Sequence, residues 1–170
     1  MSGYYLNMIT KEQKNQIEKV VVNIGTGRMS QAGNFDKQIL PELIKELKVI
    51  TGQAPQVIKS KQAISGFKLK INQIIGLKIT LRQKRAVDFL NRLINIVLPR
   101  IKDFRGLKPS VIDKNGILNI GIKDKVIFPE IAPEDSKVSF GLEVSVIPKF
   151  RNKEKAVALF KEMKVPVKHG

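Results

Sequence analysis

The sequence contains no cysteine and no tryptophan, and its only histidine, His169, is the penultimate residue. Without cysteine, the chain can form neither disulfides nor thiolate metal sites. A lone terminal histidine has no partners with which to build a catalytic or metal site. No apolar run approaches the ~18 residues that span a bilayer, and the N-terminal residues lack the basic and apolar regions of a signal peptide. We therefore expect a soluble protein with no metal, no cofactor and no membrane partner.

Acidic residues are also scarce, with 15 Asp and Glu against 31 Lys and Arg, so the formal net charge is +16. Such a surplus of one sign destabilises a compact chain unless a polyanion neutralises it. Nucleic acid is the first candidate, well ahead of an anionic membrane surface. Residues 47–87 contain no acidic residue, whereas residues 113–143 lean acidic. The basic residues of the acid-free window lie among apolar ones, as on a folded scaffold: Lys48, Lys59, Lys61, Lys68, Lys70, Lys78, Arg82, Lys84 and Arg85.

Catalytic motifs are missing as well. Gly25 and Gly27 follow a predicted strand, but Ser30 stands where the dinucleotide-binding pattern requires a third glycine. The carboxylates are dispersed and form no motif with histidine, so neither acid–base nor metal chemistry has a visible constellation. We predict that the chain is not an enzyme. An enzyme with a basic docking face would need a titratable cluster in a cleft, and the sequence offers none.

Hydrophobic patterning predicts an α+β fold. A short N-terminal segment, residues 1–16, would precede a single domain, residues 17–170, because a chain of this length favours one core. Alternating or β-branched runs predict five strands, at 17–24, 56–59, 76–82, 117–122 and 142–148.

Apolar residues at helical spacing predict three helices. One follows a cap at Asn34 or Asp36, one covers 84–98, and one begins at Asn152. A protruding hairpin near 67–76, with Asn72 and Gln73 at or near its tip, interrupts the alternation of strands and helices. We expect a mainly antiparallel sheet with helices on one face, which leaves the other face free to bind RNA.

The segment 60–68, SKQAISGFK, is the sharpest candidate for a binding loop. Its small residues let a ligand approach the backbone closely, and its lysines offer contacts to phosphates. Its phenylalanine can stack on a base or belong to the core. The residues that we assign to RNA contact in and beside this segment are Lys59, Lys61, Ser65, Phe67 and Lys68.

Seven segments together resemble one family, bacterial-type large-subunit ribosomal protein L5 (uL5). They occur in the order and near the spacing of that family, from about residue 17 to the end. The segments are VVNIGTG (21–27), ITGQAP (50–55), KSKQAISGFKLK (59–70), IGLKITLR (75–82), FLNRLINIVLPRIKDFRGL (89–107), LNIGIKDKVIFPEI (118–131) and MKVPVK (163–168).

The resemblance implies a curved sheet and a structural role in the central protuberance of the large subunit. The implied partners are 5S rRNA, large-subunit rRNA, neighbouring protuberance proteins, P-site tRNA and a small-subunit protein across an intersubunit bridge. The acidic-leaning part resembles the region that faces the small-subunit protein. The positions that match the family's RNA-facing residues are Lys19, Asn23, Gln53 and Thr80. Those that match its tRNA-contacting hairpin are Lys70, Asn72, Gln73 and Ile74.

The chain departs from the family at two places. The family usually has a longer N-terminal helix before the first strand, whereas about sixteen residues precede that strand here. The hairpin tip reads NQIIG (72–76), where the family often has GMPIG. The setting implied is the cytoplasmic ribosome of a bacterium, with an organellar ribosome as the alternative. A general single-stranded RNA- or DNA-binding module is the alternative function, and it would need exposed aromatic residues on its strands.

Overall fold

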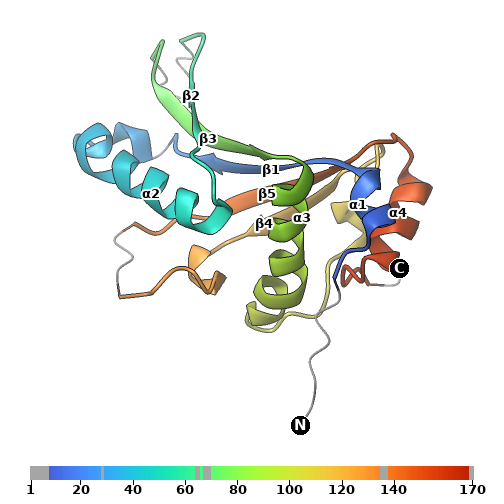
Figure 1. Ribbon diagram of the computed structural model, residues 1–170. Helices are drawn as coiled ribbons and strands as arrows, with labels where there is room; N and C mark the ends of the chain where they lie inside the picture. The colour runs from blue at the N-terminus through green and yellow to red at the C-terminus, as the bar shows by residue number, and fades with distance from the viewer. Residues whose placement is uncertain (1–7, 28, 64–65, 67–69, 135–137, 169–170) are drawn as a thin grey trace.

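The computed structural model describes residues 8–27, 29–63, 66, 70–134 and 138–168. These residues form one antiparallel sheet of five strands in the order β2-β3-β1-β5-β4 (Figure 1). The α+β fold predicted from the patterning is confirmed. The strands are β1 (Ile17–Gly25), β2 (Gln56–Lys59), β3 (Ile74–Leu81), β4 (Leu118–Ile122) and β5 (Leu142–Pro148).

The central strand β1 shows why the two faces of the sheet differ. Its β-branched residues suit a pleated sheet, and its alternate side chains point to opposite faces. Val20, Val22 and Ile24 are buried in the core, whereas Asn23 is exposed on the other face. The neighbouring strands β3, β5 and β4 alternate in the same way, so the core lies on one side of the sheet.

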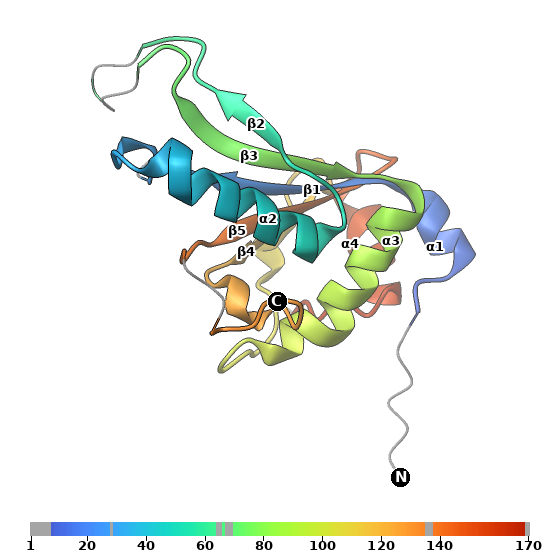
Figure 2. The same cartoon turned by 60° about the vertical axis from the view of Figure 1, so that its left-hand side comes forward.

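Three helices cover the apolar side of the sheet: α2 (Leu40–Thr51), α3 (Gln83–Arg92) and α4 (Lys153–Glu162). Both views place them on the same side (Figures 1 and 2). A π-helical turn precedes α2, and Pro41 lies in its first turn, where a missing N–H costs nothing. Gly52 ends α2 with a φ of 72°, a conformation that glycine adopts without strain. No described helix is long and apolar enough to cross a membrane.

A fourth helix, α1 (Lys11–Gln16), was not predicted from the sequence. Thr10 and Gln13 form a capping box, in which each side chain accepts a hydrogen bond from the backbone N–H of the other residue. The helix has no buried residue, so no apolar stripe indicates it. The T-x-x-Q spacing was the available signal.

The hairpin of β2 and β3 differs from the one predicted. The N–H of Ser60 donates to the carbonyl of Gln73 at 2.8 Å, and the N–H of Asn72 donates to the carbonyl of Ser60 at 3.0 Å. Asn72 and Gln73 therefore lie at the base of the loop, and the prediction that they form its tip is wrong. Lys70 and Ile71 belong to a turn that Asn72 continues with a φ of 65°.

Two ion pairs join the segment after β4 to the helices. Lys125, whose side chain has no exposed surface, contacts Glu46 of α2, and its Nζ lies 4.5 Å from the centre of the Phe140 ring. Arg92 of α3 contacts Glu130, and both of these side chains are partly exposed. The second carboxylate oxygen of Glu46 is buried without a hydrogen-bond partner among the described residues. Because the Lys125–Glu46 pair is removed from water, the loss of either partner leaves a buried charge.

Candidate nucleic-acid interface

The face of the sheet on which no described helix packs, here called the open face, displays polar side chains in register. One line of residues, here called the central row, crosses all five strands through neighbouring pairs of the register. Adjacent strands lie ~4.8 Å apart, so the central row spans roughly 19 Å. Its members, in strand order from β2 to β4, are Gln56, Lys78, Asn23, Glu143 and Gly121.

A second line of the open face lies two residues further along the strands. It places Thr80 of β3 opposite Val21 of β1 and Val21 opposite Ser145 of β5. Ser145 in turn lies opposite Asn119 of β4. Thr80 is half-buried and Asn23 is exposed, so the two predicted RNA-contacting residues share one face. Amide and hydroxyl groups can bond both base edges and ribose 2′-hydroxyls.

Gln53 takes part in contacts within the protein. Its Nε2 donates to the carbonyl of Thr80 at 3.2 Å, and its Oε1 accepts from Arg85 at 3.1 Å. The side chain thus ties the turn after α2 to β3 and holds Arg85 beside it. One hydrogen of its amide nitrogen remains for a further acceptor. The structure therefore gives Gln53 a positioning role in addition to the contact predicted from the sequence.

Lys19 lies on the open face opposite Ile147 of β5, and its ammonium group is 3.0 Å from the carboxylate of Glu18. The hydrogen bond and the charge of Lys19 lower the pKa of Glu18 below its usual value, and the charge of Arg82 acts in the same direction. Arg82 lies 3.9 Å from the same carboxylate. Two cations share one anion here, so this end of the open face keeps a net positive charge.

The acid-free window includes the β2 edge of the sheet, and the exposed lysines around its hairpin are here called the basic edge. The window comprises the end of α2, the hairpin of β2 and β3, and the start of α3, and the hairpin extends beyond the helical layer (Figure 2). Lys59, Lys61, Lys70 and Lys78 are all exposed there. The predicted contacts Ser65, Phe67 and Lys68 lie outside the described residues.

The root of the hairpin is fixed to the segment after β1. Gln73 donates from Nε2 to the hydroxyl of Ser30 at 2.9 Å, and its Oε1 accepts from the N–H of Lys70 at 2.9 Å. Ile74, predicted with the tRNA-contacting residues, packs partly against the core. Ile71 nearby has 61% of its surface exposed. Hydrogen bonds therefore fix both ends of the loop where it joins the sheet.

Three carboxylates of the acidic-leaning part support local structure: Asp113, Asp124 and Glu130. Glu130 contacts Arg92, and Asp113 accepts from the N–H groups of Asn115 and Ile117 at 2.8 and 2.9 Å. Glu143 differs, because it lies in the central row next to Asn23. The sequence grouped it with the acidic part, since only the register of β1 and β5 shows its place.

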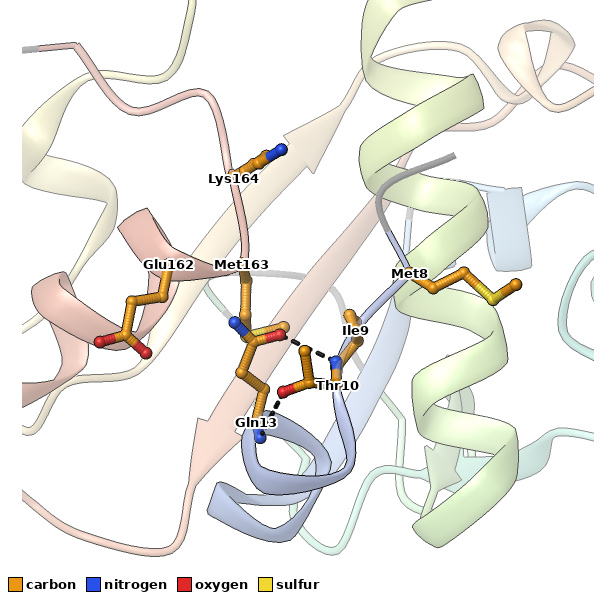
Figure 3. A pocket seen from close by; sticks show the side chains of 7 residues that line it. All are labelled: Met8, Ile9, Thr10, Gln13, Glu162, Met163 and Lys164. Carbon is orange, nitrogen blue, oxygen red and sulfur yellow. Dashed lines mark hydrogen bonds between the residues drawn. The ribbon is translucent and has the colours of Figure 1, made fainter. Parts of the chain in front are cut away.

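The hollows known to be lined by described residues bring together no catalytic arrangement. The one between α1 and the end of α4, about 310 Å³ in volume, is lined by the capping box and by Glu162 and Lys164 (Figure 3). Thr10 and Gln13 are already engaged with each other. No group of three or more His, Cys, Asp or Glu side chains that could hold a metal ion occurs in the described part of the chain.

The fold and the open face define a class of protein: a basic α+β protein with one helix-free, polar sheet face suited to RNA. Comparison with known families agrees. Residues 10–70 match the model of ribosomal protein L5, and residues 74–167 match the model of the C-terminus of the same ribosomal family.

Several large-subunit proteins are similar to the chain over most of its length. The uL5c protein of Gracilaria tenuistipitata var. liui is 42% identical over 151 residues, which cover 89% of this chain and 82% of that protein. The uL5 protein of Syntrophomonas wolfei is 42% identical over 154 residues, covering 91% and 84%. That of Trichodesmium erythraeum is 40% identical over 154 residues, covering 91% and 83%.

The chain therefore belongs to the ribosomal protein L5 family. It is a structural protein of the large ribosomal subunit and not an enzyme. Bacterial and chloroplast proteins are both among its relatives, and the ribosome is the setting that they share.

Proposed function

We propose that this chain binds 5S rRNA in the central protuberance through the open face of its sheet. The observation that supports the proposal most strongly is the register of the sheet. It brings Asn23, Lys78 and Thr80 together on a face that no helix covers. These three residues offer an amide, a cation and a hydroxyl, which match a base edge, a phosphate and a ribose.

Binding proceeds in two stages. The basic edge formed by the hairpin first attracts the RNA, because a net charge of +16 steers polyanions toward the protein. Asn23 and Thr80 then form direct hydrogen bonds that depend on the shape and sequence of the bound RNA. The first stage supplies most of the affinity, and the second supplies the preference for 5S rRNA.

Two further contacts belong to the same proposal. The loop 60–73 reaches P-site tRNA, supported by its exposed Lys61 and Lys70 and by the hydrogen bonds that fix its ends. The exposed Asp124 and Glu134 face a basic small-subunit protein across an intersubunit bridge. Neighbouring large-subunit rRNA and protuberance proteins complete the environment.

Single-stranded binding by base stacking receives no support from the sheet. That mode uses aromatic side chains on the strands as stacking platforms. None of the five strands that the structure describes contains an aromatic residue, and Phe104 lies partly buried against the core.

Alanine substitution at Asn23 or Thr80 is expected to weaken binding of 5S rRNA by about 1–3 kcal/mol, the cost of leaving a polar partner unpaired. Equilibrium binding to labelled 5S rRNA measures the effect. An unrelated RNA hairpin should show much smaller changes, because its contacts are mainly to phosphates.

The matched control is Asn34→Ala, since Asn34 is an exposed amide beside α2 and away from the sheet strands. It should bind 5S rRNA as the unmodified chain does. Equal losses for Asn23→Ala and Asn34→Ala would show that the open face has no special role.

A further inference from the structure

A hollow of about 400 Å³ lies at the end of the central row, between β1, β5 and the end of β4. Its base is backbone, because Gly25, Gly121 and Gly141 line it. Asn23, Lys123 and Glu143 stand around this base. The volume falls within the range of small-ligand sites. A base without side chains admits a flat group against the sheet.

The glycines show that the hollow is open to the surface. A Cβ at Gly25 or Gly121 would meet nothing within 4 Å, so the space above both is empty. A Cβ at Gly141 would lie 2.8 Å from the carbonyl oxygen of Ile122, so glycine is required there for β5 to begin so close to the end of β4. The hollow is thus bounded by packing on one side and open on the other.

Glu143 is out of place on a surface that binds phosphates. It is exposed and forms no ion pair or side-chain hydrogen bond within the described part of the chain. Its charge repels an approaching RNA backbone. A carboxylate accepts hydrogen bonds and cannot donate them, so a group of the RNA with hydrogen-bond donors can offset that repulsion. Lys78 and Lys123 nearby favour a partner that is itself part of a polyanion.

Guanine is the base whose chemistry fits a carboxylate. Its Watson–Crick edge presents two adjacent donors, N1–H and the N2 amino group, which two carboxylate oxygens can accept together. Adenine and cytosine place an acceptor nitrogen beside their amino group, and uracil places carbonyls on both sides of its N–H. Unpaired bases of RNA are read on this edge.

We propose that this hollow holds an unpaired guanine of the bound RNA, with Glu143 accepting from N1–H and N2–H. The flat base lies over Gly121 beside the Glu143 carboxylate, and Lys123 is placed for a flanking phosphate. This inference rests on the proposed function, because it assigns one contact of the RNA that the open face binds.

The direction in which Glu143→Gln changes the affinity for RNA distinguishes a carboxylate that binds guanine from one that takes no part in binding. Glu143→Gln removes a negative charge, so a bystander carboxylate would give equal or tighter binding of RNA. A guanine-reading carboxylate gives weaker binding, by roughly 5- to 150-fold, the range of a bidentate base contact. Glu162→Gln is the matched control, since Glu162 is an exposed carboxylate at the end of α4. It should leave the affinity unchanged or slightly raised.

A second variant tests the hollow itself. Gly121→Val places a β-branched side chain into space where no atom lies within 4 Å of its Cβ, on a strand that favours such residues. It should keep the melting temperature of the protein and lower the affinity for 5S rRNA at least fivefold, as expected for loss of a bidentate base contact. Should this variant fail to fold, Glu143→Gln alone still decides, because it changes no volume.

The readout is 5S rRNA probed with kethoxal, which reacts with N1 and N2 of unpaired guanines. The unmodified chain should protect at least one guanine, and Glu143→Gln should lose that protection while other protections persist. Tight binding with unchanged guanine protection in Glu143→Gln would overturn the guanine site and leave the proposed function standing. Absence of any 5S rRNA binding by the unmodified chain would overturn both.

Discussion

Replacing Lys125 with methionine is expected to lower the free energy of unfolding by about 3–5 kcal/mol, the cost of breaking a buried ion pair from one side. Lys125 has no exposed surface, and Glu46 would keep a charge with no partner in the core. One oxygen of Glu46 already lacks a hydrogen bond among the described residues. Methionine fills nearly the same volume, so the loss would report charge and not a cavity. Denaturant unfolding followed by circular dichroism measures it.

Two variants complete this test. The double substitution Glu46→Leu and Lys125→Met removes both charges and should recover most of the stability, because apolar pairs replace buried ion pairs at little cost. Lys123→Met changes an exposed lysine two residues away and should shift stability by less than ~0.5 kcal/mol. Equal stability of Lys125→Met and the unmodified chain would mean that the pair contributes nothing to the fold.

Removing four lysines from the basic edge is expected to weaken 5S rRNA binding on the order of 100-fold or more at moderate salt. The substitutions are alanine at Lys59, Lys61, Lys70 and Lys78, all exposed. Each phosphate contact contributes about 0.7–0.9 to the slope of log affinity against log salt, so the slope should fall by about 3. Titrations over a range of salt concentrations give both quantities.

The matched control removes the same charge from the helical side of the molecule. All four lysines are exposed; Lys153, Lys155 and Lys161 lie in α4, and Lys102 lies in the turn that follows Leu98–Arg100. Their replacement by alanine should leave the slope nearly unchanged. If the two quadruple variants lost affinity and slope equally, the RNA would respond to total charge and not to the basic edge.

The sequence predicts this fold well where local periodicity and burial agree. The alternation of residues 76–82 is enough, by itself, to assign Thr80 to the polar face of the sheet. Asn23 stands in a continuous β-branched run, so only the resemblance pointed to it. The pairing of Glu46 with Lys125, 79 residues apart, has no local signal, because a charged residue in a helix is ordinarily exposed to solvent. The tip of the hairpin was predicted at Asn72 and Gln73, but Asn72 continues a turn at the base of the loop.

The same limit applies to the candidate site. Lys78 and Asn23 were each plausible RNA contacts from charge or resemblance, but their alignment with Glu143 depends on the register of three strands. Gln53 was predicted as a contact, and its bonds to Thr80 and Arg85 show a supporting role that only tertiary structure reveals. Gly25 was considered only for a dinucleotide-binding pattern that Ser30 breaks, and Gly121 and Gly141 had no functional signal in the sequence. Their hollow forms only when three strands meet.

The most direct measurement of the central claim is the affinity of the unmodified chain for 5S rRNA and for an unrelated RNA hairpin at the same salt concentration. If the open face recognises 5S rRNA, that RNA should bind on the order of 1,000-fold more tightly, the lower range for specific over non-specific nucleic-acid binding. Equal affinity for the two RNAs would show that the charge of the chain binds RNA without recognition, and would contradict the claim.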